Sequence, residues 1–158
     1  MLDLSVDWLT LELINQRREL MNTQRPSVSK ETILKASKVI AVNVNGDAHE
    51  IASCYYPHID GYELAKNLEN TYSWDINVNM IEELDQIQWE VDSIHKQVCM
   101  QWVIDDDIKP PFDDGVKIKE GVIKGVYRHG AAMFMVTKYG ETMEGRHQII
   151  KFEDAVEV

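Results

Sequence analysis

Apolar and polar residues alternate with a period of two in the last third of the chain, and glycine or short polar runs separate the alternating segments. This period is typical of half-buried strands, and glycine tolerates the backbone angles of tight turns. The pattern predicts five strands, near 116–119, 121–128, 132–139, 146–152 and 155–158. Five short strands are too few for a β-sandwich. The pattern therefore predicts a small β-barrel over residues 115–158.

Helical periodicity dominates the first two thirds of the chain. Apolar residues recur there at spacings of three and four, which is typical of amphipathic helices. Ser5 and Ser29 are candidate N-caps, because a serine side chain accepts a hydrogen bond from the first helical turn. Pro26 breaks the pattern between them. The expected helices cover residues 5–22, 30–36, 62–73 and 79–104.

One short part of this region indicates strands instead. Residues 38–44 and 49–56 are two runs with many apolar residues, and they flank Asn45-Gly46-Asp47. Asparagine and glycine accept the positive φ angles of a two-residue turn. We therefore expect a β-hairpin centred on Asn45 and Gly46.

These elements predict an α+β fold, with a helical N-terminal and middle region that contains a β-hairpin and is followed by a C-terminal barrel. Residues 1–107 are expected to form the first region and residues 115–158 the barrel. Residues 108–114 are expected to be a linker, because Pro110 and Pro111 stop helices and the aspartates around them stay solvated.

Charge is concentrated in one part of the chain. The 158 residues carry a net charge of −11 at pH 7. Residues 60–107 hold twelve acids and two lysines, a net charge of −10. An acidic surface repels a phosphate backbone, so we do not expect nucleic-acid binding through this middle region.

The sequence indicates a cytoplasmic protein without a membrane partner. No apolar run reaches the roughly 18 residues of a membrane span, and the first residues lack the basic start and cleavage site of a signal peptide. Cys54 and Cys99 lie far apart without CxxC spacing, so we expect buried thiols and neither a disulfide nor a zinc site.

The barrel segment has a characteristic order of motifs. Gly115 and Gly121 bracket the first strand, and the second ends at Tyr127. A third strand reads Ala131-x-Met-Phe-Met-Val, and Ile149-x-Lys-Phe-Glu-Asp closes the segment after a glycine turn. This order resembles SH3-like barrels of the KOW and Tudor type over residues 115–158, whereas we recognise no family in residues 1–114.

The resemblance implies binding of a peptide, a protein or a nucleic acid through the loops at one rim of the barrel. The segment departs from such binders in two ways. It has no basic loop, and it has no aromatic cage cluster beyond Tyr127, Phe134 and Tyr139.

Two groups of residues have types that bind metals. Asp92, His95 and Cys99 have the spacing of ligands on adjacent helical turns, but a packed thiol and a boundary histidine explain them more simply. The acids of the linker region, Asp105, Asp106, Asp107, Asp113 and Asp114, lack the regular spacing of a calcium loop. No hydrolase, dinucleotide or P-loop motif is present, so we predict no catalytic residues, no metal site and no cofactor.

The acidic middle region suggests a protein partner. A solvated helix face explains its charge most simply, but an acidic face with protruding tryptophans also fits the basic cleft of another protein. The predicted function is therefore a non-enzymatic protein-interaction module, and small size and acidity favour a factor from a phage or mobile element. The candidate partner-binding residues are Trp74, Glu82, Glu83, Asp85, Trp89, Glu90 and Asp92.

Three alternatives stay open at this point. A nucleic-acid-binding protein would use the basic strip of the barrel, Lys117, Lys119, Lys124 and Arg128. A metal-dependent enzyme would use the acid clusters. The leucine-rich first helix fits a homodimer as well as it fits a core within one chain.

Overall fold

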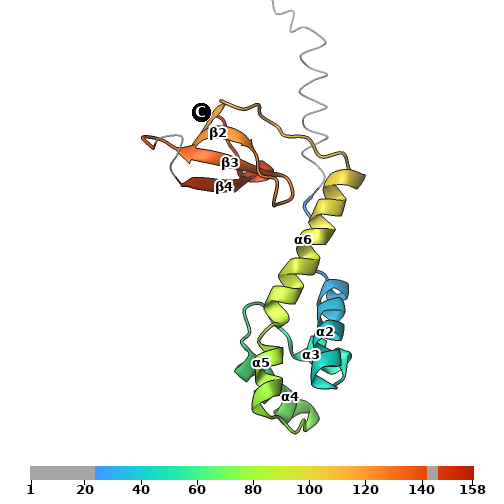
Figure 1. The fold of residues 1–158 in the computed structure, drawn as a ribbon. Coiled ribbons are helices and arrows are strands. Elements are labelled where there is room, and N and C mark those ends of the chain that lie inside the picture. The colour runs from blue at the N-terminus through green and yellow to red at the C-terminus, as the bar shows by residue number, and fades with distance from the viewer. Residues whose placement is uncertain (1–23, 142–145) are drawn as a thin grey trace, which may run out of the picture. The chain divides into compact units, whose positions relative to one another are not determined.

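The computed structural model describes residues 24–141 and 146–158 and shows an α+β protein (Figure 1). Its elements fall into two compact units. Pro26–Val98 forms the helical unit, and Cys99–Val158 forms the sheet unit together with Gln24 and Arg25. The helix expected over residues 5–22 lies outside the described residues.

Helix α2 (Lys30–Val44) begins where the sequence predicts and ends much later. The side chain of Ser29 caps it by accepting a hydrogen bond from the backbone nitrogen of Thr32, at 3.1 Å. The helix does not end at Ala36, because Ala36, Ile40 and Val44 follow at spacings of four and are all buried. Burial of this face outweighs the weaker helix propensity of the β-branched residues.

The predicted β-hairpin is wrong, because both of its expected strands are helical. Asn45 has a left-handed backbone, with φ at 52°, but it is the C-cap of α2. Asp47 then caps helix α3 (Ala48–Cys54) by accepting hydrogen bonds from the backbone nitrogens of His49 and Glu50. Positive φ is as useful for ending a helix as for turning a hairpin, so the same residues join two helices here.

The next helix is confirmed, whereas the long helix expected over 79–104 is wrong as a single element. Helix α4 (Gly61–Tyr72) covers the segment expected at 62–73. The longer segment divides into α5 (Val78–Leu84) and α6 (Ile87–Asp105). At the division the carboxylate of Asp85 accepts a hydrogen bond from the backbone nitrogen of Gly61, at 2.7 Å, which ties the end of α5 to the start of α4.

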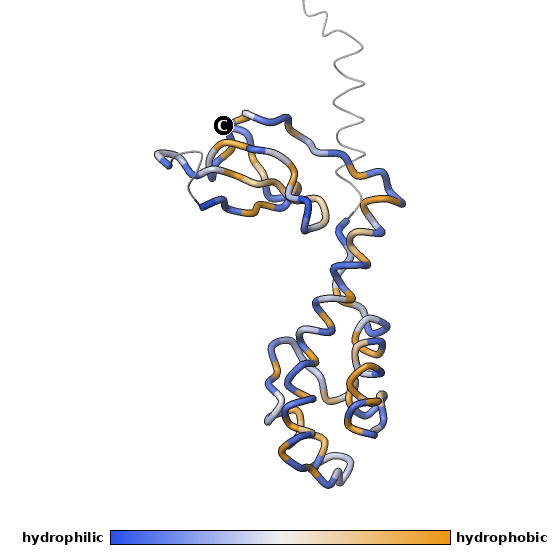
Figure 2. The backbone as a smooth tube through the Cα atoms, in the orientation of Figure 1, coloured by the Kyte–Doolittle hydropathy of each residue, from blue (hydrophilic) through white to orange (hydrophobic). Residues whose placement is uncertain are grey.

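One apolar core holds the helical unit together. Figure 2 shows polar and apolar residues mixed along each helix, as amphipathic packing requires. The largest fully buried side chains of this unit are Ile40, Ile51, Leu64, Leu68, Leu84, Ile87 and Val91. Each fully buried side chain of this size stabilises the fold by about 1.5–3 kcal/mol relative to an exposed one.

The sheet unit confirms four predicted strands in antiparallel order along the chain. They are β1 (Lys117–Ile118), β2 (Gly121–Val126), β3 (Met133–Lys138) and β4 (His147–Lys151). A register shift between Ile123 and Gly125 marks a bulge in β2. The short helix η1 (Phe152–Asp154) follows β4.

The strand expected at 155–158 is reduced to a single bridge. Ile118 pairs with Glu157, and the backbone nitrogen of Lys119 donates to the carbonyl of Val156 at 2.9 Å. The last residues therefore return to β1. The sheet stays open between β4 and these residues, and it is not a closed barrel.

The core of the sheet unit lies on one face of the sheet. Phe134 is fully buried, and its ring centroid lies 4.4 Å from that of Phe152. Trp102 from the end of α6 and Phe112 from the segment before β1 also pack against this core. The expected linker therefore supplies an apolar side chain to the sheet unit.

No helix in the described ranges, 24–141 and 146–158, has the length and apolar character needed to cross a membrane.

Candidate functional site

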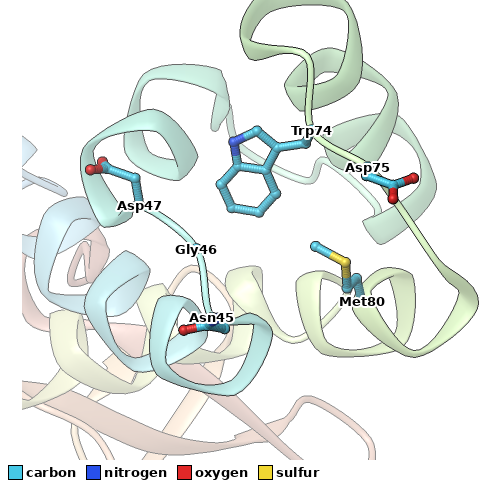
Figure 3. Close-up of a pocket in the computed structure, with 6 residues that line it drawn as sticks. All are labelled: Asn45, Gly46, Asp47, Trp74, Asp75 and Met80. Atoms are coloured by element: carbon cyan, nitrogen blue, oxygen red, sulfur yellow. The ribbon is translucent and has the colours of Figure 1, made fainter.

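The helical unit has a pocket of about 360 Å³ between the turn that joins α2 to α3 and the segment that leads into α5. Figure 3 shows the indole of Trp74 between these two segments. The lining residues are Asn45, Gly46, Asp47, Trp74, Asp75 and Met80. Trp74 is the one predicted partner-binding residue among them.

The position of Trp74 depends on how α4 ends. Ser73 has φ at 60° and is the C-cap of α4, so the chain turns sharply just before the tryptophan. The indole nitrogen donates a hydrogen bond to the carboxylate of Glu50 in α3, at 2.5 Å. The ring also packs against the core of the helical unit. These contacts hold the indole in a fixed place beside the pocket.

Gly46 allows the indole to lie against the backbone. A Cβ atom added at this residue would lie 2.1 Å from one ring carbon of Trp74, far inside van der Waals contact. The requirement here is space, because any larger residue at position 46 displaces the ring.

The rim of the pocket is acidic. Asp75 is exposed, and Asp47 lies at the rim on the opposite side of the indole (Figure 3). Both carboxylates point away from the ring in this view. The lining contains no lysine or arginine. An aromatic face beside carboxylates attracts cations, because the ring quadrupole and the negative charges act in the same direction.

The other predicted partner-binding residues are distributed over α5 and α6, and several have contacts within the helical unit. Glu83 accepts a hydrogen bond from the side chain of Asn43 at 2.9 Å, and Asp92 accepts one from Gln88 at 2.9 Å. Asp85 holds the backbone nitrogen of Gly61. Trp89 lies outside the pocket lining and is 64% exposed. Glu82 is exposed and Glu90 is half-buried.

The helical unit as a whole keeps a large negative charge. Residues 26–98 hold twelve acids and five lysines, a net charge of −7. Lys35 pairs with Glu31 at 2.8 Å within α2, so one of these lysines is already engaged. A basic partner would therefore meet an attractive potential before contact.

The residues of the predicted nucleic-acid strip are not cross-strand partners of one another. Lys117 in β1 pairs with Val122. Lys124 lies at the bulge of β2 and is half-buried, whereas Lys119 and Arg128 are exposed residues outside the strands. The strip stays a prediction.

The metal candidates do not form a cluster in the described structure. Within residues 24–141 and 146–158, no three histidine, cysteine or acidic side chains lie close enough together to hold one ion. Cys54 and Cys99 do not form a disulfide, and Cys99 is buried as expected, whereas Cys54 is only half-buried.

Sequence reasoning missed a polar cluster of the sheet unit, which surrounds Arg25. Its guanidinium donates to the carbonyls of Ala131 and Ala132, at 2.7 and 2.9 Å. It also pairs through two nitrogens with the carboxylate of Glu153 and lies 5.2 Å from the ring centroid of Trp102. No local signal pointed to Arg25, because its hydrogen-bond partners named here lie more than a hundred residues away in the sequence.

The two charges of this cluster stabilise each other. Burial acts to lower the pKa of Arg25, but the hydrogen bond and charge of Glu153 outweigh it, and the pKa lies above its ordinary value. Burial likewise acts to raise the pKa of Glu153, but the hydrogen bond from Arg25 leads the opposing effects, and the pKa lies below its ordinary value. Both groups are therefore charged near neutral pH.

Comparisons of the chain with protein-family models, with curated proteins and with solved structures gave no match.

Proposed function

We propose that this protein is a non-enzymatic interaction module whose helical unit binds a partner protein through basic side chains of that partner. The observation that carries the proposal is the pocket beside Trp74, where an indole face is flanked by the acidic residues Asp47 and Asp75. It lies on a unit with a net charge of −7.

The pocket suits a lysine or arginine side chain better than a neutral ligand. A cation over an indole gains about 0.5–2 kcal/mol, depending on how far it is desolvated. The long aliphatic stem of such a side chain packs against apolar surface while its charged end stays near carboxylates. Met80 supplies that apolar surface at the pocket.

The sheet unit supports a second part of the proposal, that residues 115–158 form an SH3-like barrel that is incompletely closed. Four antiparallel strands follow one another in order, a 3₁₀-helix comes after the fourth, and the last residues return to the first strand.

A binding titration tests the proposed partner chemistry. The probe is a dye-labelled peptide of alternating glycine and lysine, and the readout is fluorescence anisotropy with the full-length protein. We expect Asp75→Asn and Trp74→Leu each to weaken binding about threefold or more, since each removes about 0.7 kcal/mol or more of attraction to the cation. Gly46→Ala should act like Trp74→Leu, because it displaces the indole.

A matched charge variant separates the pocket from the general field of the helical unit. Glu69 is an exposed acid of α4 outside the pocket lining, so Glu69→Gln makes the same charge change elsewhere on the unit. It should change the affinity less than twofold. Equal losses for Glu69→Gln and Asp75→Asn would refute a pocket-specific role, and tighter binding of a polyanion than of the lysine peptide would refute the proposal as a whole.

A further inference from the structure

Strand β4 is an open edge of the sheet. The sheet order is β1-β2-β3-β4, and Figure 1 shows β4 as an outer strand. The opposite edge, at β1, is partly occupied by the bridge between Ile118 and Glu157. Within the described ranges, β4 pairs with β3 and with no other strand. Such an edge is a template for a further strand.

The register identifies the backbone groups that face outward. Met133 pairs with Lys151, and the backbone nitrogen of Phe152 donates to the carbonyl of Ala132 at 3.0 Å. Residues of an antiparallel strand alternate between hydrogen bonding to the neighbour and facing away from it. His147, Ile149 and Lys151 therefore direct their N–H and C=O groups away from β3.

The side chains of these same three residues are exposed. Exposure alternates along β4, with Gln148 and Ile150 half-buried between them, and Ile149 is 39% exposed. Arg146, directly before the strand, is exposed as well. The edge thus carries an apolar residue flanked by basic ones.

No acid within residues 146–151 offsets this basic character. The nearest acids in the sequence are Glu144 before this run and Glu153 and Asp154 after it, and the carboxylate of Glu153 is paired with Arg25. An acidic strand paired with β4 therefore has no acid of β4 directly opposite it.

We propose that the open edge of β4 binds an extended segment of another protein in which an apolar residue lies between two acidic residues at alternate positions. The apolar residue would lie opposite Ile149, and the acids opposite His147 and Lys151. Opposite charges across paired strands are stabilising, and like charges are destabilising. This surface is separate from the pocket of the helical unit and takes a partner of opposite charge.

A second copy of this chain fits the edge poorly. Antiparallel pairing of two β4 strands about Ile149 would place Lys151 of each copy opposite His147 of the other. Basic residues on an edge strand are a recognised protection against such self-pairing. The same residues that discourage a second copy attract an acidic strand.

Amide NMR signals of the isotope-labelled full-length protein test the proposal. The probe is a blocked peptide with the sequence Thr-Glu-Thr-Val-Thr-Glu-Thr. We expect saturable shifts of the Ile149 and Lys151 amides, because the new hydrogen bonds form there. A peptide N-methylated at its Glu and Val residues, whose amides would face β4, should bind about tenfold more weakly or not at all, since it lacks the donors to the strand.

Charge-swapped pairs provide the decisive comparison. Lys151→Glu should weaken binding of the glutamate peptide about tenfold, and the peptide Thr-Lys-Thr-Val-Thr-Lys-Thr should bind the variant better than it binds the original protein. Lys119→Glu is the matched control, because it makes the same change at an exposed residue beside the opposite edge, and it should leave both affinities unchanged. Unchanged amide signals in Phe134 and Val136 would show that each variant keeps its core.

Several outcomes would overturn the proposal. They are an absence of shifts at Ile149 and Lys151 with millimolar peptide, equal affinity for the glutamate and lysine peptides, or an equal loss with Lys119→Glu. Shifts of the same amides on dilution of the protein alone would mean that a second copy occupies the edge. Shifts there with an oligouridine probe, but with neither peptide, would assign the edge to nucleic acid.

Discussion

The side chain of Arg25 combines hydrogen bonds to two carbonyls with an ion pair to Glu153 and a contact with the ring of Trp102. A planar guanidinium with five donors in fixed directions is able to bind two carbonyls and a carboxylate at once, which the ammonium of lysine does not reproduce. The cluster joins a residue before the helical unit to residues of the sheet unit. Arg25 is thus a structural residue in a stretch that reads as a plain loop.

Replacement of the Arg25 guanidinium should destabilise the sheet unit. We expect Arg25→Lys to lower the free energy of unfolding by about 1–3 kcal/mol, because the carbonyls of Ala131 and Ala132 lose charged donors. Glu153→Gln should cost less, about 1 kcal/mol, because the carboxylate is 43% exposed and solvent screens the pair. Urea unfolding at pH 7 measures the change in the free energy of unfolding for both variants.

The same pair predicts the direction of a pH effect. The pKa of Glu153 is lowered in the folded state, so its contribution is fully present above its unfolded value near 4.5 and is lost as pH falls through the folded pKa. The difference in stability between the original protein and Glu153→Gln should therefore shrink on acidification. Glu157→Gln removes an exposed acid and is the control. If the difference in stability between the original protein and Glu153→Gln stayed constant down to pH 2, the lowered pKa of Glu153 would be contradicted.

At the scale of elements, the turn at Asn45 shows how one local signal serves two structures. Asn45 occupies the left-handed region, as a hairpin turn would require, and the backbone nitrogen of Gly46 donates to the carbonyl of Ala41, closing the end of α2. The expectation of positive φ at Asn45 is confirmed. The packing of Ile40 and Val44 in the core of the helical unit favours helix over strand. The local sequence does not contain this information.

Substitutions at Asn45 test its capping role. Asn45→Gly should change the stability by only a few tenths of a kcal/mol, since glycine adopts this backbone freely, whereas Asn45→Val should cost about 1–2 kcal/mol. Thermal unfolding followed by circular dichroism at the helical wavelength compares them. Equal effects of glycine and valine would mean that the backbone at this residue is not left-handed in solution.

The strands were more predictable than the helices for a physical reason. Antiparallel strands joined by short turns are specified locally, by alternation and glycine, so four of the five expected strands are confirmed. The fifth depends on pairing with β1, which lies about forty residues earlier, and the division between α5 and α6 depends on the contact of Asp85 with Gly61. In the pocket, Trp74 was a predicted partner-binding residue and Asp75 follows it directly in the sequence, whereas Gly46 and Asp47 join them only through tertiary packing.

At the scale of the whole molecule, the described residues form two separate apolar cores. Leu64 belongs to the core of the helical unit and Phe134 to that of the sheet unit, and both are fully buried. Large-to-small substitutions at such sites typically cost about 2–5 kcal/mol. The cost should fall on the unit whose core is changed.

Hydrogen exchange read by mass spectrometry tests this independence. Phe134→Ala should accelerate exchange in β2, β3 and β4 while α3 and α4 keep their protection, and Leu64→Ala should do the reverse. The paired variants are controls for each other. Uniform acceleration over both units by either variant would show that the two cores unfold as one.

The cluster around Arg25 also has a consequence for the order of folding during synthesis. Every helix of the helical unit up to Val98 is complete in the growing chain before the first residue of the sheet is made. Glu153 follows Arg25 by 128 residues, which takes about 6–25 s at typical rates of translation. For that interval the guanidinium has been synthesised and its carboxylate has not, so the sheet unit acquires this link late, after the helical unit has had time to fold.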